Sequence, residues 1–261
     1  MLASALGALL VGLAPAAAQG PADLRSAFGE AFSGADACVA LRDVAPGAQT
    51  AVSDPELCAR RVPPCATFEI PASVIAIDRG VVPDANAPVK RQPPIEGDPA
   101  DGVNLRDAFR KPAPWVYEEV ARRIGSETFG RALGAMRYGT AESKGPVETL
   151  GRSPDVDGLV LSPVEQAEFL TRMKRGELPT SAESQARTVE IFPAENIGDS
   201  VLAIKSGSCS GTAWAVGWVN RGQRATIFAA VEIGAGVTAE DVSARARRLI
   251  GSLGLTPAPA R

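Results

Sequence analysis

The side chains that can act as acids, bases or nucleophiles in this chain are limited by one absence. None of the 261 residues is histidine. This excludes Ser-His-Asp and Cys-His activation of a nucleophile, and any zinc or iron centre bound by histidine. Acid–base chemistry must therefore use Asp, Glu, Lys, Tyr or Cys.

Several groups of such residues are better explained by structure than by chemistry. Thr171 and Lys174 have T-x-x-K spacing, but they fall at the charged end of an expected helix and predict a solvated face. Asp155 and Asp157 lie close together without the order of an EF-hand loop, so capping of a loop is expected. The glycines of the last third precede no helix in a phosphate-loop pattern. They are Gly207, Gly211 and Gly217.

The cysteines are the remaining nucleophiles, and they number four: Cys38, Cys58, Cys65 and Cys209. An even count without C-x-x-C spacing fits disulfides in an oxidising location better than a redox or zinc site. The pair closest in sequence, Cys58 and Cys65, is the preferred disulfide, with two free buried thiols as the alternative. Cys65 itself is expected to be a structural thiol or half of a disulfide.

The elements that would position these residues follow a change of apolar period along the chain. Helical spacing dominates the middle and strand-length runs lie towards both ends. Helices are expected at 22–33, 67–80, 163–174, 181–191 and 239–253, with three more between 105 and 136. Strands are expected at 37–41, 50–52, 200–205, 212–220 and 225–233. Residues 81–103 are expected to form an irregular stretch.

Capping residues support several of these boundaries. Thr67 is expected to cap the second helix and Gly80 to end it. Ser162 and Thr180 each precede a glutamate by three residues, which is the capping-box pattern. Early and late strands around a helical middle imply one antiparallel sheet completed by distant segments.

The N-terminus and the composition set the location and exclude some partners. Residues 1–18 are apolar and end in Ala-x-Ala, which predicts a signal peptide, followed by one domain over 19–261. A membrane anchor or a buried helix is the alternative for this segment. A net charge of −3 and 5% aromatic residues argue against nucleic-acid binding. The expected location is periplasmic or secreted, with no membrane span after removal of the signal.

The segment Cys65–Pro71, Cys-Ala-Thr-Phe-Glu-Ile-Pro, resembles the nucleophile segment of class D serine β-lactamases, whose core is Ser-Thr-Phe-Lys. Other stretches resemble the same family in the same order, over about residues 30–255: 115–125, 136–140, 161–170, 203–207 and 215–219. The chain is identified as a member of this family. The resemblance implies an α/β (α+β) fold, with an antiparallel sheet flanked by helices and an all-helical lobe.

The resemblance also implies that the catalytic groups are lost. The family's serine falls at Ala66 and its carbamylated lysine at Glu69. The serine of its S-x-V motif falls at Pro112, the asparagine of Tyr-Gly-Asn at Thr140, and the tryptophan that shelters the carbamate at Pro154. No cofactor and no metal is implied.

The recognition groups are kept. The K-[ST]-G strand is present, and the oxyanion hole would use the main-chain N–H groups of Ala66 and Ser208. The binding residues implied are Lys205, Ser206, Gly207, Ser208 and Trp115.

Glu69 has two interpretations. It could activate a water as a general base, or it could form an ion pair with Lys205 that fills the old site. Burying either charge alone would be costly, about 3–5 kcal/mol on breaking a buried pair, so the ion pair is favoured.

Three hypotheses for function follow. The first is an exported, catalytically impaired pseudo-β-lactamase that still binds a β-lactam or a peptidoglycan-related small molecule. The second is a hydrolase of β-lactams, amides or esters that uses water and Glu69. The third is a periplasmic structural or interaction protein whose pocket is closed.

Overall fold

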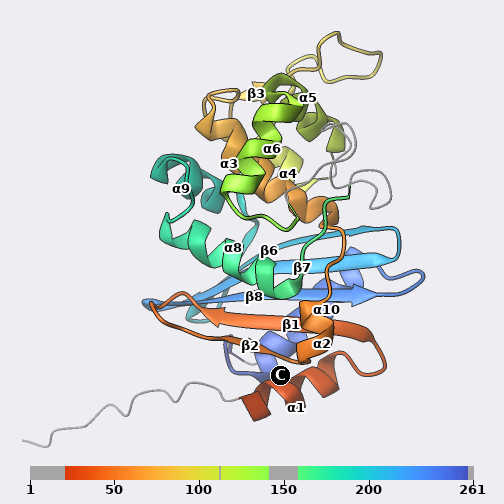
Figure 1. The fold of residues 1–261 in the computed structure, drawn as a ribbon, viewed down its shortest axis with the longest axis vertical. Helices are drawn as coiled ribbons and strands as arrows, with labels where there is room; N and C mark the ends of the chain where they lie inside the picture. Colours follow the sequence, from red (N-terminus) through yellow and green to blue (C-terminus); the bar gives the residue numbers. More distant parts are fainter. Residues whose placement is uncertain (1–20, 112, 141–157, 258–261) are drawn as a thin grey trace, which may run out of the picture.

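A six-stranded antiparallel sheet forms the centre of the protein (Figure 1). The computed structural model describes residues 21–111, 113–140 and 158–257. The strand order across the sheet is β2-β1-β8-β7-β6-β5. The strands are β1 (Asp36–Asp43), β2 (Thr50–Val52), β5 (Ala194–Ile197), β6 (Ser200–Cys209), β7 (Thr212–Arg221) and β8 (Arg224–Ile233).

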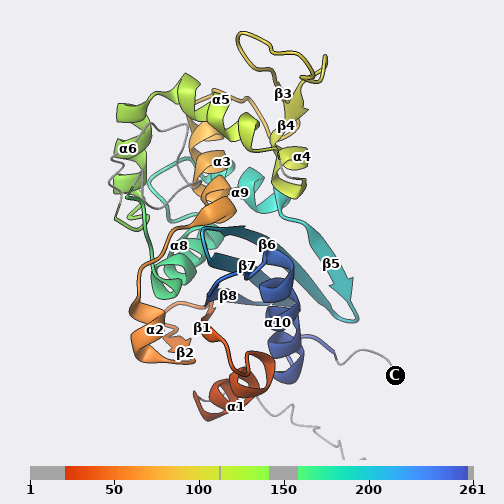
Figure 2. The ribbon, with the colours of Figure 1, turned by 90° about the vertical axis from the view of Figure 1, so that its right-hand side faces the viewer.

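Helices cover both faces of this sheet (Figure 2). α1 (Pro21–Ala31) and α10 (Ala239–Ser252) pack on one face. The other face carries α8 (Pro163–Arg175) and, beyond it, the helical lobe. The remaining elements are α2 (Pro55–Ala59), the 3-10 helix η1 (Cys65–Phe68), α3 (Glu69–Asp78), β3 (Pro88–Val89), β4 (Val103–Asn104), α4 (Leu105–Arg110), α5 (Pro114–Ile124), α6 (Ser126–Ala135) and α9 (Ala182–Ile191).

The buried side chains form two clusters, one on each face of the sheet. Alternation along β7 separates them, because successive side chains of a strand point to opposite faces. Trp214 and Trp218 join the cluster under the helical lobe, while Ala213 and Ala215 join the cluster under α10. The central strands are therefore apolar on both faces, which explains their near-continuous apolar runs.

The expected fold class is confirmed, as are most of the expected elements. The capping box of Ser162 and Glu165 is present at the start of α8. Two expectations about caps are wrong. The cap of α9 is Ser181, which accepts from the N–H of Ser184, and the Thr67 hydroxyl donates to the carbonyl of Pro64 at 2.7 Å.

Four short elements were not expected from the sequence. α2 and β5 have five and four residues, too few for a periodic pattern to emerge, and β3 and β4 form a two-stranded sheet within the stretch expected to be irregular. Among the helices of the described ranges, none is long and apolar enough to cross a membrane. The predicted signal peptide lies outside those ranges.

Candidate functional site

Ala66 lies on η1, directly before the buried helix α3. Residues 70–76 of α3 are all buried, because α5, α6 and α9 pack around the helix. η1 contacts β6 and β7. Gly207 of β6 comes so near that a Cβ added to it would lie 2.5 Å from the Cβ of Ala66. The sheet backbone therefore packs directly against Ala66, the residue expected at the motif serine position.

Glu69 and Lys205 form a buried ion pair at this junction. The Lys205 Nζ lies 2.5 Å from the Glu69 Oε2, and the side chains are 8% and 12% exposed for lysine and glutamate. The same ammonium donates to the carbonyl of Phe109 at 2.6 Å and lies 4.3 Å from the centre of the Phe109 ring. The ion pair predicted from the sequence is confirmed.

The ionisation of this site follows from its burial. Burial raises the pKa of the Glu69 carboxyl, and the nearby charge of Lys205 and its hydrogen bond offset part of that effect. Glu69 and Lys205 therefore depend on each other, since either charge alone would be desolvated without compensation.

Ser73 and Tyr117 extend the site beneath Glu69. The Ser73 hydroxyl donates to the main-chain carbonyl of Glu69 at 2.8 Å and lies 3.1 Å from the Tyr117 hydroxyl. Because the Ser73 proton is already used, Tyr117 is the donor in the second bond. Burial raises the pKa of Tyr117 well above its usual value, and the negative charge of Glu69 adds to that. Tyr117 is thus a neutral donor and not a base.

The sequence did not single out Ser73, Tyr117 or Phe109. A signal existed for Ser73, since it is a polar residue inside an apolar helix that is buried all round. Phe109 contributes a main-chain carbonyl, which no side-chain pattern can reveal.

The other expected binding residues lie on β6 and on α5. Ser206 is half-buried and Ser208 is exposed, and both lie on β6 beside β7. The ring of Trp115, on α5, is covered by the guanidinium of Arg91 at 5.1 Å. The oxyanion hole stays a prediction. Pro112 and Pro154 lie outside the described residues.

Thr140, which is expected at the position of the family's asparagine, has structural partners. Its hydroxyl donates to the carbonyl of Gly158 at 3.1 Å, and its N–H donates to the carbonyl of Val160 at 2.9 Å. Tyr138 is fully buried, edge-on to the ring of Phe169 at 4.8 Å. Thr140 therefore joins two parts of the chain.

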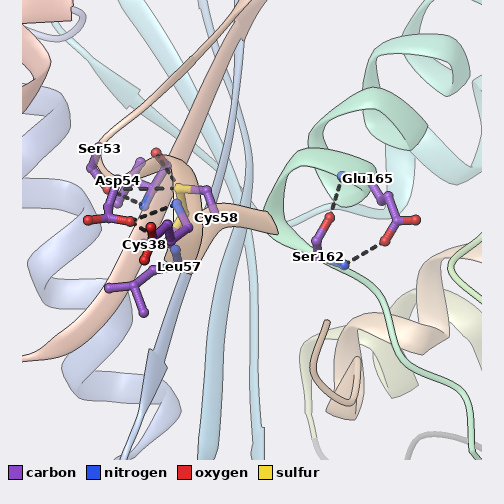
Figure 3. Close-up of a disulfide and its surroundings, with 9 residues drawn as sticks. Cys38, Ser53, Asp54, Leu57, Cys58, Ser162 and Glu165 are labelled. Carbon is purple, nitrogen blue, oxygen red and sulfur yellow. Dashed lines mark hydrogen bonds between the residues drawn. A yellow bond between two sulfur atoms is a disulfide. The ribbon is translucent and has the colours of Figure 1, made fainter. Parts of the chain in front are cut away.

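The disulfides differ from the preferred prediction. The bonds are Cys38–Cys58 and Cys65–Cys209, so the pairing of Cys58 with Cys65 is wrong, as is the alternative of two free thiols. Figure 3 shows the first of them where α2 lies against β1. Cys65 begins η1, which contacts β6 and β7, whereas Cys58 lies on α2 against β1. The two cysteines therefore face different strands although they are close in sequence. That Cys65 is half of a disulfide is confirmed.

Two further expectations concern charged residues. The solvated face expected for Thr171 and Lys174 is wrong, because Thr171 is buried and the ammonium of Lys174 lies 4.6 Å from the centre of the Trp218 ring. Asp155 and Asp157 lie outside the described residues. Within the ranges that are described, no three Cys, Asp or Glu side chains gather as a metal site would require.

The comparisons with known proteins agree on one family. The penicillin binding protein transpeptidase domain family matches residues 44–249. The β-lactamase OXA-20 of Pseudomonas aeruginosa is 30% identical over 218 residues, which cover 81% of this chain and 80% of that protein. The chain belongs to the class D serine β-lactamase family.

A second relative and a solved structure have the same family description. The β-lactamase OXA-15 of Pseudomonas aeruginosa is 32% identical over 68% of this chain, and the match spans 64% of the length of OXA-15. A class D β-lactamase structure from Bacillus subtilis superposes with a TM-score of 0.77 at 21% identity, covering 87% of this chain and 95% of that one. This last likeness shows the fold alone.

The chemistry open to this class D family member is limited by its own side chains. Residue 66 has a methyl group, which cannot attack a carbonyl. The carboxylate of Glu69 is bonded to Lys205, and the ammonium of Lys205 is shared between that carboxylate and the Phe109 carbonyl. A carboxylate base, Glu69, and a cation, Lys205, are thus present, but both are already bonded to other groups of the protein.

Proposed function

We propose that this chain is an exported, catalytically inactive member of the class D family, whose former substrate site is filled by its own ion pair. The single observation that carries the proposal is the contact between Lys205 and Glu69, beside Ala66. The Glu69 carboxylate takes the place beside the Lys205 ammonium that the carboxylate of a ligand would otherwise occupy.

Covalent catalysis lacks the nucleophile of the family motif in this arrangement. Acyl transfer in the family requires a serine oxygen activated by an adjacent base. Ala66 has no such oxygen, and the nearby hydroxyls of Ser73 and Tyr117 are buried and bonded to each other. Cys65, next in sequence, is in a disulfide with Cys209. An acyl-enzyme is therefore not expected.

The alternative of water activation by Glu69 is less well supported. A general base must reach a water that can attack a bound carbonyl. The Glu69 Oε2 accepts from Lys205 at 2.5 Å, and proton abstraction would neutralise the carboxylate and leave the ammonium without its counter-charge. The same contact favours a closed site over one that still binds β-lactams, because release of Lys205 to a ligand would strand Glu69.

Export is supported by two independent features. Residues 1–18 have the composition of a signal peptide. Two disulfides use all four cysteines, which is typical of proteins that fold in an oxidising compartment.

The decisive experiment combines turnover and intact mass with a panel of penicillins, cephalosporins and carbapenems. We expect no hydrolysis above the rate without protein, no mass increase and no ligand-dependent rise in melting temperature. The matched variants are Ala66→Ser, which restores only a hydroxyl, and Ala66→Ser/Glu69→Lys, which restores both motif residues. Both should stay weak, because Pro112 still stands where the family has its second serine.

A stoichiometric acyl adduct on the parent protein would overturn the proposal. Turnover that disappears in Glu69→Gln would replace it with the water-activation hypothesis. A saturable thermal shift without turnover would favour a protein that retains ligand binding.

A further inference from the structure

A second cluster of charged side chains lies away from Glu69 and Lys205, where α8 meets β1 and the end of α6. A hollow of about 350 Å³ opens there. Its lining includes four arginines, namely Arg42, Arg137, Arg172 and Arg175. Glu165, Glu168 and Thr171 complete the lining. The family comparison and the proposed function assign nothing to this place.

Neutral groups hold two of these guanidinium groups in position. Arg172 donates to the carbonyl of Met136 at 2.7 Å, and Arg175 donates to the carbonyl of Val44 at 2.6 Å. A carbonyl orients a guanidinium but leaves its charge in place. Burial and the nearby charge of Arg137 lower the pKa of Arg172, and the charges of Glu168 and Glu177 offset part of that effect.

Arg42 has a donor left over. Its Nη1 donates to the hydroxyl of Thr50 at 2.9 Å, while its Nε is buried with no hydrogen-bond partner in the described structure. A buried donor without an acceptor is uncommon in folded proteins, so the described residues leave part of the hydrogen-bonding capacity of the Arg42 guanidinium unused.

The carboxylates of the region do not balance the arginines. Glu165 receives Arg61 through two nitrogens and also caps α8, and Glu177 lies 3.6 Å from Arg175. With Arg61 counted, five guanidinium groups face three carboxylates, those of Glu165, Glu168 and Glu177. Among the described residues, these eight side chains therefore carry a net charge of +2.

Arg137 occupies a position where glycine would be easier to accommodate. Its φ is 52°, in the left-handed region, directly after the end of α6. The N–H of Tyr138 donates to the carbonyl of Leu133 at 3.1 Å, as in a helix-ending motif that favours glycine at this place. Arg137 has no hydrogen bond or ion pair to another residue of the described ranges. The described structure therefore gives no structural reason for a charged side chain at this position.

We propose that this pocket binds a phosphate dianion, either free or as the terminal monoester of a larger molecule. Guanidinium groups present paired N–H donors that match phosphate oxygens, and a dianion neutralises a charge of +2. A phosphate monoester is doubly charged at neutral pH, since its second pKa is about 6. A hollow of about 350 Å³ has room for on the order of ten water molecules, so more than the bare ion fits.

The test is calorimetric titration of the full chain with inorganic phosphate and, separately, with phenyl phosphate, at constant ionic strength and neutral pH. Saturable binding of either one is expected. Tighter binding of phenyl phosphate identifies a monoester as the ligand form, and binding of inorganic phosphate alone identifies the free ion. Succinate, a dianion without phosphate geometry, serves as the ligand control and should bind at least about tenfold more weakly.

Two substitutions at one position separate binding from folding. Arg137→Gln should raise the Kd at least about tenfold, which is the loss of one charge-assisted hydrogen bond. Arg137→Gly should lose the same affinity while its melting temperature equals or exceeds that of the parent, because glycine adopts this backbone conformation readily. Arg25→Gln is the matched control, an equal charge change at an exposed arginine of α1 outside the pocket, and should leave the Kd within about twofold.

Three results would overturn the proposal. One is no saturable heat with either phosphate at about 10 mM, ten times a Kd of about 1 mM. Another is succinate binding as tightly as the phosphates. The last is an equal loss of affinity in Arg25→Gln, which would mean general attraction by net charge.

Discussion

Removal of the Lys205 ammonium tests the physical basis of the closed site. Lys205→Met keeps an unbranched apolar stem but leaves Glu69 buried without a cation, and the Phe109 carbonyl without its donor. Breaking a buried pair from one side costs about 3–5 kcal/mol. Protonation of Glu69, whose pKa is already raised by burial, keeps the cost from rising further. For a domain of this size that loss lowers the melting temperature by about 6–20 °C.

The contribution of the pair is isolated by a double-mutant cycle. Glu69→Gln, Lys205→Met and the double variant are unfolded in urea, with the fluorescence of buried Trp214 and Trp218 as the signal. The double variant should be more stable than the sum of the two single losses predicts, by at least about 2 kcal/mol, because no lone charge remains.

The control for this cycle is an ion pair at the surface. Arg131 lies 2.5 Å from Glu127, and their side chains are 68% and 82% exposed. Arg131→Met should change the free energy of unfolding by less than about 1 kcal/mol. Mutual dependence of Glu69 and Lys205 is refuted if the losses of Glu69→Gln and Lys205→Met add to within about 0.5 kcal/mol, or if the loss in Lys205→Met equals that in the control.

Three further changes test other parts of the structure. Gly207→Ala places a Cβ 2.5 Å from that of Ala66 and should cost about 1–3 kcal/mol in urea unfolding; an unchanged midpoint contradicts the close approach. Burial would raise the pKa of Glu119, but the hydrogen bonds and charges of two arginines lower it overall from 4.5. The folded state therefore binds the Glu119 proton less tightly than the unfolded state does. The stability that this adds is present above pH 4.5 and is lost as the pH falls through the folded pKa. In urea unfolding measured at a series of pH values, Glu119→Gln should lack this part of the loss of stability in acid. Cys65→Ser/Cys209→Ser opens a connection of 144 residues and should cost about 5 kcal/mol by loop entropy, against about 3 for the other disulfide at a separation of 20; equal losses in denaturant contradict this.

The long helices and strands and the ion pair could be predicted, because both depend on residue patterns that can be read along the sequence. Helical and strand periods follow from which faces are buried. The pairing of Glu69 with Lys205 followed from motif order and from the cost of burying one charge. The capping box at Ser162 was equally local.

Features that depend on the path of the chain were missed. Cys58 and Cys65 are seven positions apart in the numbering, yet Cys58 faces β1 and Cys65 faces the end of β6. Between them, Val62 bridges to Leu161 and holds the segment extended, which separates the two thiols. Ser181 in place of Thr180 shows that adjacent candidates for a cap cannot be distinguished by residue type alone.

The Cys65–Cys209 disulfide also makes the helical lobe part of a closed covalent ring. The chain enters the lobe at Cys65 and has returned through β6 by Cys209, so α3 to α9 lie between the two joined residues. A single peptide-bond cleavage within that ring leaves one molecule, whose two pieces separate only after reduction and unfolding. Cleavage before Cys65, outside the ring, has no such tether from this bond. The disulfide beside Ala66 thus keeps the helical lobe attached to the sheet after a single cleavage within the ring.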